Sequence, residues 1–195
     1  MKKIIFSLLA AMVSLSIWAK ENIDPKYAEG AVPVNEKGSV YFTGVIDIPS
    51  QMTPDECYRL VLSWARGRFA QPSAQEGRII SENADNRRFV IHVSQILTFK
   101  RTGLVADEAE IEYNFSVAVG EKSITATMTD IKYRYEEGRE GGGQAFTAEE
   151  WITDEEAYNA RRTKFYKRAG KFRIKTIDLK DRLFESISQC LSENR

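Results

Sequence analysis

The sequence predicts a two-layer α+β domain, in which an antiparallel sheet of about five strands carries two helices packed on one of its faces. Three observations lead to this prediction. Apolar and polar residues alternate in several segments, a period of two that marks strands with one wet face. Two other segments carry apolar stripes at helical spacing. Because one sheet face and both stripes need cover, the helices must pack together on that face.

The predicted element order is β-α-β-β-β-β-α, and the domain begins at Ser39. Residues 40–48 alternate between apolar and polar side chains and predict the first strand. Thr53 and Glu56 then have the spacing of a capping box, with a proline at the first helical position between them. The helix is predicted to run to about Phe69, and its broad apolar face is expected to be mostly covered.

Four further strands with short connections are predicted near residues 78–83, 88–100, 108–119 and 122–135. The third of these shows the cleanest alternation in the chain, which is typical of a sheet with one solvated face. In the fourth, the apolar phase slips between Met128 and Ile131. This slip predicts a β-bulge near Thr129 and Asp130.

The stretch from about 136 to 175 is longer than such a domain needs, and we treat it as an insertion. Residues 136–146 contain three consecutive glycines and are predicted to form a flexible loop. A helix is predicted over about 154–169, stopped by Gly170. The closing helix of the domain is then expected to begin near Thr176.

The first nineteen residues have the layout of a secretory signal peptide. Lys2 and Lys3 precede the apolar residues 4–18, and Ala19 is a small residue at a cleavage point. No cysteine lies there, so acylation of a new N-terminal cysteine is excluded and no lipoprotein is expected. We therefore expect an exported protein, periplasmic or extracellular; an uncleaved N-terminal anchor is the alternative.

Residues 20–38 are polar, lack either hydrophobic period, and are predicted to be a flexible leader before a single domain at 39–195. The chain balances 28 Lys and Arg against 28 Asp and Glu. Loss of Lys2 and Lys3 with the signal peptide leaves a slight acidic excess. A chain without a basic excess has no global field that favours nucleic acid, so no nucleic-acid partner is expected.

No catalytic or metal-binding motif is apparent, so neither a cofactor nor a metal is predicted, and we expect the chain not to be an enzyme. His92 is the single histidine, and with two distant cysteines it makes none of the usual zinc arrangements. Glu110 and Glu112 lie two apart on one strand, a spacing that could bring two acids together for glycoside chemistry. The same spacing is typical of the solvated face of a strand.

Cys57 and Cys190 both fall on apolar stripes of the predicted helices. In an oxidising compartment two such residues are candidates for a disulfide. Two buried thiols that act as small apolar side chains are the alternative. The sequence leaves both open, because it does not fix how the helices are aligned.

Residues 161–175 combine eight basic side chains with three aromatic ones and contain no acid. Such a stretch could lie on an anionic membrane surface or dock on another envelope component. Acidic residues within 136–156 could instead neutralise it. The candidate partner surface consists of Arg161, Arg162, Lys164, Lys167 and Arg168.

The leading functional expectation is a non-enzymatic binding domain of the cell envelope, for a lipid, a peptide or a partner protein. The helices are rich in large side chains that could border an apolar cleft, although such residues also fill cores. The candidate cleft residues are Tyr58, Trp64, Phe69 and Phe184. A structural or assembly role, with docking through residues 161–175, is the alternative.

Several segments resemble a family of exported proteins from Bacteroidetes-type bacteria. The matching residues are Val40-Tyr41-Phe42, Ile48-Pro49 before the capped helix, Trp64, and the run TDIKYRY within 128–135. The family is classed as a domain of unknown function with a TBP-like fold, and the resemblance covers roughly 39–135. It implies the fold only: the DNA binding of the fold's namesake does not transfer, and no catalytic residues follow.

Overall fold

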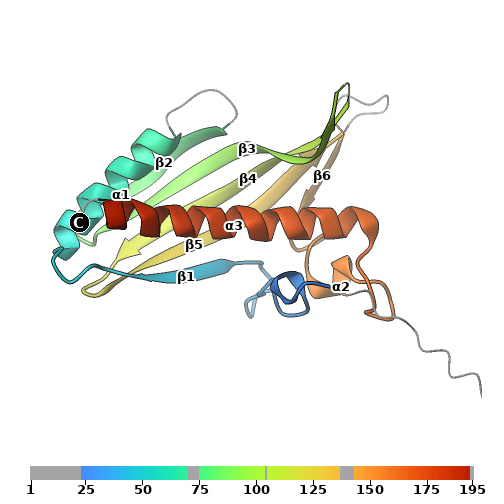
Figure 1. The fold of residues 1–195 in the computed structure, drawn as a ribbon, viewed down its shortest axis with the longest axis horizontal. Coiled ribbons are helices and arrows are strands. Elements are labelled where there is room, and N and C mark those ends of the chain that lie inside the picture. The colour runs from blue at the N-terminus through green and yellow to red at the C-terminus, as the bar shows by residue number, and fades with distance from the viewer. Residues whose placement is uncertain (1–22, 70–74, 104, 137–142, 194–195) are drawn as a thin grey trace, which may run out of the picture.

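The computed structural model describes residues 23–69, 75–103, 105–136 and 143–193, and it contains one antiparallel sheet with two long helices on one face (Figure 1). This confirms the predicted α+β architecture. The predicted signal peptide lies outside the described residues.

The sheet has six strands, one more than the sequence analysis expects, in the order β1-β5-β4-β3-β2 with β6 paired to β5. The strands are β1 (Phe42–Asp47), β2 (Gln75–Asn83), β3 (Arg88–Thr102), β4 (Val105–Val119), β5 (Ser123–Tyr135) and β6 (Gln144–Thr147). Strand β1 pairs with the first half of β5 and β6 with its second half. Because β4 takes the other side of β5, β1 and β6 lie along the same edge.

The alternation along β4 divides the two faces of the sheet as predicted. Ile111, Tyr113 and Phe115 are buried beneath the helices, while Glu110 and Asn114 lie on the uncovered face. The burial of such side chains is the main stabilising contribution to a fold of this kind.

The predicted bulge in β5 is also confirmed. The pairing of β5 with β4 shifts by one residue between Lys132 and Thr129, and Asp130 adopts a φ of 53°. An extra residue in a left-handed conformation is what bends a strand at a bulge. The bend allows the two halves of β5 to pair with different strands, β1 and β6.

Two helices cover the apolar face, α1 (Pro54–Phe69) and α3 (Lys167–Glu193). The capping box at the start of α1 is present: the Thr53 N–H donates to a Glu56 carboxylate oxygen at 2.8 Å, and the Glu56 N–H donates to the Thr53 hydroxyl at 3.3 Å. The last turns of α3 cross the beginning of α1 (Figure 1).

Cys57 and Cys190 are both buried thiols on these two helices. The disulfide between them stays a prediction.

The helices expected in the insertion are wrong in extent. Helix α2 covers only Asp154–Ala157, and α3 begins at Lys167 and continues through Gly170 without a break. The Asn159 side chain accepts the Thr163 N–H at 2.8 Å, which favours a loop at the point where the predicted helix would continue. Gly170 lies inside the helix and does not end it. Packing explains the glycine, since a Cβ there would lie 2.6 Å from the Cβ of Phe165.

The end of the predicted flexible loop 136–146 is part of strand β6. Phe146 is buried, with its ring centroid 5.3 Å from that of Tyr133 on β5. A four-residue strand is too short to show a period of two, so the sequence pattern could not reveal it.

The predicted leader, residues 20–38, belongs to the folded unit over its described part. Pro25–Tyr27 forms the 3-10 helix η1, and Val32 is buried in the core. The Gly30 N–H donates to an Asp154 carboxylate oxygen at 2.7 Å. Hydrogen bonds to side chains far along the sequence hold this segment in place. A segment held in this way needs no hydrophobic period, which is why the sequence pattern did not reveal it.

Arg173 is the centre of these bonds and is completely buried. Its guanidinium donates to the carbonyl oxygens of Tyr27 and Ile152, each at 2.8 Å, and to that of Ala28. It also pairs with Asp154 at 2.7 Å. This one side chain of α3 therefore holds η1 and α2 against the end of the sheet. Its positive charge is compensated by the Asp154 carboxylate and by the three carbonyl oxygens.

We expect Gly77→Ala to destabilise the fold. An added Cβ would lie 2.4 Å from the Cβ of Phe69, which is fixed to the backbone of α1 and cannot swing away. The free energy of unfolding should fall by about 1–3 kcal/mol in urea denaturation. Gly67→Ala is the control: nothing lies within 4 Å of its added Cβ, and this helical site should gain about 0.5–1 kcal/mol. Equal losses in both variants would contradict the packing argument.

Arg173→Met should lower the free energy of unfolding by about 3–5 kcal/mol, because it leaves the half-buried carboxylate of Asp154 without its cation and three backbone carbonyls without their donor. The measurement is again urea denaturation. Arg168→Met removes a charge from the exposed side of the same helix and should change stability by no more than about 0.5 kcal/mol. A loss at Arg173 as small as this control would show that the buried cation is dispensable.

Burial, and next the nearby Cys190, raise the pKa of the Cys57 thiol to about 11. The folded protein should therefore react slowly with iodoacetamide at neutral pH, since only the thiolate attacks. Mass spectrometry after alkylation in urea without reductant then decides the state of the pair. Two added groups mean two thiols, whereas none before reduction means a disulfide. Fast alkylation of Cys57 in the folded protein would contradict its burial.

Candidate functional site

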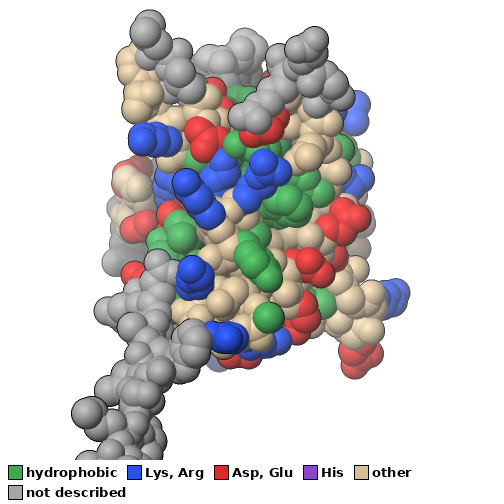
Figure 2. Space-filling view, turned by 90° about the vertical axis from the view of Figure 1, so that its right-hand side faces the viewer, with side chains coloured by type: hydrophobic (Ala, Val, Ile, Leu, Met, Phe, Trp, Pro, Cys, Tyr) green, Lys and Arg blue, Asp and Glu red, His purple; other side chains and the backbone are tan. Residues whose placement is uncertain are grey.

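An open hollow of about 620 Å³ lies where the start of α3 meets the N-terminal segment. Its lining combines three lysines, three aromatic rings and two isoleucines: Ile23, Asp24, Tyr27, Lys164, Phe165, Tyr166, Lys167, Gly170, Lys171 and Ile174. Figure 2 shows this end of the molecule, where Lys and Arg side chains are interspersed with hydrophobic ones. We call this site the basic aromatic hollow.

The loop between α2 and α3 forms one wall of the hollow. Tyr158 and Phe165 form an isolated antiparallel bridge, with ring centroids 4.7 Å apart, and the Tyr166 N–H donates to the Ala157 carbonyl at 2.8 Å. Arg162 sits at the tip of this loop with a φ of 50°. The loop thus returns on itself and presents residues 164–167 beside the N-terminal segment.

The aromatic part of the lining is partly exposed. Phe165 packs directly against Gly170 of α3, where a larger residue would collide with it. Tyr166 is 52% exposed, one of the large hydrophobic side chains most open to solvent in the described residues. An exposed ring beside cations is suited to a surface that is apolar in one part and anionic in another.

Two of the three lysines that line the hollow, Lys164 and Lys167, have no ion pair with a described carboxylate. Both side chains are exposed. The first turn of α3 also contains no acidic residue, so the positive end of its helix dipole adds to the field. Asp24 is the single carboxylate in the lining, and it already accepts the Lys26 N–H at 2.9 Å. The net electrostatic character of the hollow is therefore positive.

Lys171 lines the hollow with its stem, but its ammonium group is engaged elsewhere. Its Nζ lies 2.7 Å from an Asp107 oxygen and 2.8 Å from the Tyr135 hydroxyl, over the ring of Phe99 at 4.4 Å. This cation fixes α3 to the β3–β4 hairpin and to β5. It is part of the supporting structure and leaves Lys164 and Lys167 as the accessible charges.

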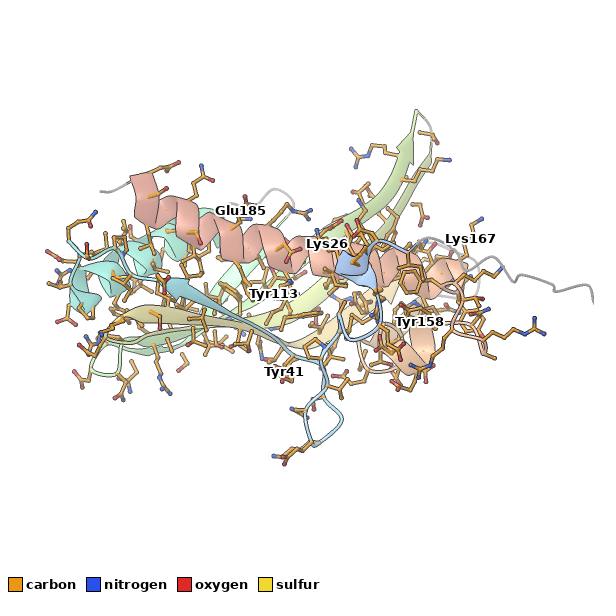
Figure 3. All side chains as sticks on the ribbon, turned by 60° about the horizontal axis from the view of Figure 1, so that its bottom comes forward. Lys26, Tyr41, Tyr113, Tyr158, Lys167 and Glu185 are labelled. Atoms are coloured by element: carbon orange, nitrogen blue, oxygen red, sulfur yellow. The ribbon has the colours of Figure 1, made fainter. Side chains whose placement is uncertain are left out.

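Helix η1 forms the opposite wall and is held by α3. The Tyr27 hydroxyl donates to Asp178 at 2.7 Å, and Lys26 Nζ lies 2.6 Å from Asp178 and 3.0 Å from Asp181. The bonds to these carboxylates, Asp178 first, raise the pKa of Lys26, and the bond to Asp178 raises that of Tyr27. Tyr27 is therefore a neutral wall of the hollow. Figure 3 shows Lys26 beside the middle of α3 and Lys167 at the start of that helix.

The predicted partner surface divides into two groups. Its members Arg161, Arg162, Lys164, Lys167 and Arg168 are all exposed. Arg162 pairs with Glu29 and lies 3.5 Å from Glu155, and Arg168 donates to Gln144 at 3.2 Å. One acid of the insertion, Glu155, and one of the N-terminal segment, Glu29, thus contact Arg162, whereas Lys164 and Lys167 line the hollow.

The residues predicted for an apolar cleft pack in or against the core. Tyr58 and Phe69 are buried, while Trp64 and Phe184 are partly buried against the core cluster. The Phe184 ring fills the space above Gly44. None of the hollows described here is lined by these four side chains, and the apolar cleft stays a prediction.

The acids on the uncovered sheet face are tied into ion pairs. One guanidinium nitrogen of Arg134 lies 2.8 Å from Glu110 and 2.7 Å from Glu112. The hydroxyl of Ser94, and then Arg134, hold the pKa of Glu110 below its usual range. A general acid needs a raised pKa, so this pair is poorly suited to glycoside chemistry. His92 contacts Asn114 at 3.0 Å on the same face.

Two smaller hollows, of about 300 and 460 Å³, lie near β6, and both include Lys132 and Thr147 in their lining. Over the described ranges, no three His, Cys, Asp or Glu side chains are grouped so that they could hold a metal ion. None of the helices in the described part of the chain is both long and apolar enough to span a membrane.

The sequence analysis named two residues that line the hollow, Lys164 and Lys167, but none from the N-terminal segment that forms the opposite wall. Tyr27 and Ile23 belong to the segment predicted as a leader, and they reach the hollow because α3 holds η1. The signal that could have shown it is the pair of acidic residues Asp178 and Asp181 on α3. The structure pairs both carboxylates with Lys26, which follows Ile23 and precedes Tyr27 in the sequence.

Residues 42–134 match a family model described as a domain of unknown function (DUF4468) with TBP-like fold. The crystal structure of a DUF4468 family protein from Bacteroides ovatus ATCC 8483 superposes with a TM-score of 0.77 at 25% identity, over 88% of this chain and 96% of that one. A TBP-like protein from Parabacteroides distasonis ATCC 8503 has a TM-score of 0.67 at 17% identity, over 83% and 97%, and is similar in fold.

No curated protein matches the sequence. The family match and the fold of its solved relatives confirm the predicted resemblance: residues 42–134 match the DUF4468 family model, a domain of unknown function with a TBP-like fold.

Proposed function

We propose that this protein is an exported, non-enzymatic binding domain of the cell envelope whose basic aromatic hollow binds the phosphate groups of an anionic lipid surface. The observation that carries the proposal is the pair Lys164 and Lys167. Both are exposed beside Tyr166, and no described carboxylate neutralises them.

The chemistry of the hollow fits a phosphate-bearing surface. A lysine acts on phosphate as a point charge, and each one near an anionic membrane contributes about 1 kcal/mol of binding free energy. Tyrosine rings favour the region between headgroups and acyl chains, where one part of the ring is wet and another apolar. Tyr166 is exposed next to Lys167, so the ring and the charge can contact the same lipid surface.

The position of the hollow supports the same proposal. Ile23 lines it and lies four residues after the predicted cleavage point at Ala19. Four residues span at most about 14 Å when extended. Before cleavage the hollow would therefore be held close to the membrane that the signal peptide enters, where weak contacts with headgroups gain from proximity.

The test is sedimentation of the mature protein with vesicles of phosphatidylcholine, with and without one quarter phosphatidylglycerol, at about 50 mM and about 500 mM NaCl. Binding is expected on the anionic vesicles at low salt. Lys164→Gln with Lys167→Gln should weaken it about 30-fold, because two lysines contribute about 1 kcal/mol each.

Lys37→Gln with Lys122→Gln is the matched control, since it removes the same charge from exposed positions outside the hollow. It should weaken binding far less. Equal binding to both kinds of vesicle, or equal losses in the two double variants, would rule out the hollow as a lipid site. Binding of an acidic protein partner with no binding to vesicles would favour the assembly role.

A further inference from the structure

The two outer edges of the sheet differ in how they are protected against pairing. Strand β2 has a bulge between Ile79 and Ser81 and carries charged side chains at Glu76, Arg78 and Glu82. Bulges and charges are the usual means of blocking an edge strand. Strand β1 has no bulge, since its pairing with β5 is regular, and it has a single charged side chain, Asp47, at its end after Phe-Thr-Gly-Val-Ile.

The hydrogen bonding of β1 shows which of its backbone groups point outward. The Ile48 N–H donates to the Lys122 carbonyl on the β5 side. Because bonded pairs alternate along antiparallel strands, the N–H and C=O groups of Thr43, Val45 and Asp47 point away from β5. The Tyr41 N–H, in phase with these three, donates to Pro33 on the outer side at 3.2 Å, which agrees with this assignment.

The outward groups of β1 lie in an open and apolar setting. No described backbone group donates to or accepts from the outer edge at Thr43, Val45 or Asp47. Val45 is 67% exposed, the most exposed large hydrophobic side chain in the described residues. Edge strands with unpaired backbone groups and few charged side chains are ready to pair with another strand.

We propose that β1 pairs with β1 of a second copy of this chain, antiparallel and about a two-fold axis, with Val45 opposite Val45. Thr43 then lies opposite Asp47 of the second copy, where its hydroxyl can donate to the carboxylate. Gly44 lies opposite Ile46, so the small residue leaves room for the large one. The strand is self-complementary in this register, since its two Asp47 side chains lie at opposite ends of the ladder.

The ends of the ladder are set by residues on either side. In this register Tyr41 would face Pro49 of the second copy, but its N–H is already bonded to Pro33, and proline has no N–H to donate. The contact is therefore short. Stable interfaces bury more than about 1,000 Å², which a single short ladder does not reach, so the dimer is weak and depends on concentration.

The first test is sedimentation velocity of the mature protein between about 5 and 500 μM, where a monomer–dimer equilibrium is expected. Val45→Pro should shift the dissociation constant upward at least tenfold, because it removes an outward N–H and leaves the bonds to β5 in place. Val45→Lys, which keeps the N–H but places like charges face to face, should do the same. Ile80→Ser on the β2 edge is the control and should leave the dimer unchanged.

The second test is chemical crosslinking, which also holds if the proline variant fails to fold. Val45→Cys should be joined to a second copy by a short bismaleimide, whereas Thr125→Cys, its exposed neighbour on β5, should crosslink much less. Cys57 and Cys190 are buried and stay unreactive in the folded protein. A monomer over the whole concentration range, or a dimer that neither Val45 variant weakens, would overturn the proposal. The vesicle test does not depend on this result, because no residue of β1 lines the hollow.

Discussion

The buried guanidinium of Arg173 is the contact on which the candidate site depends. It joins the carbonyls of Tyr27 and Ile152 and the carboxylate of Asp154, segments that the sheet itself does not hold. The rings of Tyr158 and Phe165 lie 5.6 and 5.5 Å from its central carbon. A buried cation with this many partners is costly to leave unpaired, so its bonds favour η1 and the segment around α2 in the positions that they have beside α3.

This dependence explains why the hollow lies where it does. One wall is η1, held by Asp178 on α3, and the other is the loop that carries Lys164 and Phe165. Both walls are thus positioned by α3, and Lys164 and Lys167 keep a fixed position relative to Tyr166. A preorganised group of charges loses less conformational entropy on binding than the same charges on a mobile loop.

The sheet could be predicted from the sequence because its signals are local. Alternation along β4 and the phase slip before Ile131 depend only on which side chains face the core, and both are found in the structure. The insertion could not be predicted in the same way. The low helix propensity of glycine predicts that the helix stops at Gly170. In the structure the helix continues through Gly170, and the contact with Phe165 leaves no room for a larger side chain there. Likewise η1 is ordered by partners some 150 residues away, and β6 is defined by its pairing with β5.

The fold by itself assigns no function, and the uncovered sheet face carries acidic as well as basic side chains. Binding to a phosphate backbone needs arginine and lysine along the contact. The central strand β4 instead presents Glu108, Glu110 and Glu112 in a row, and Arg134 is engaged with two of them. The exposed Lys164 and Lys167 lie near the start of α3, outside the residues that the family model matches. The superposition on the Bacteroides ovatus protein covers 88% of this chain, so the shared architecture extends well beyond the residues that the family model matches.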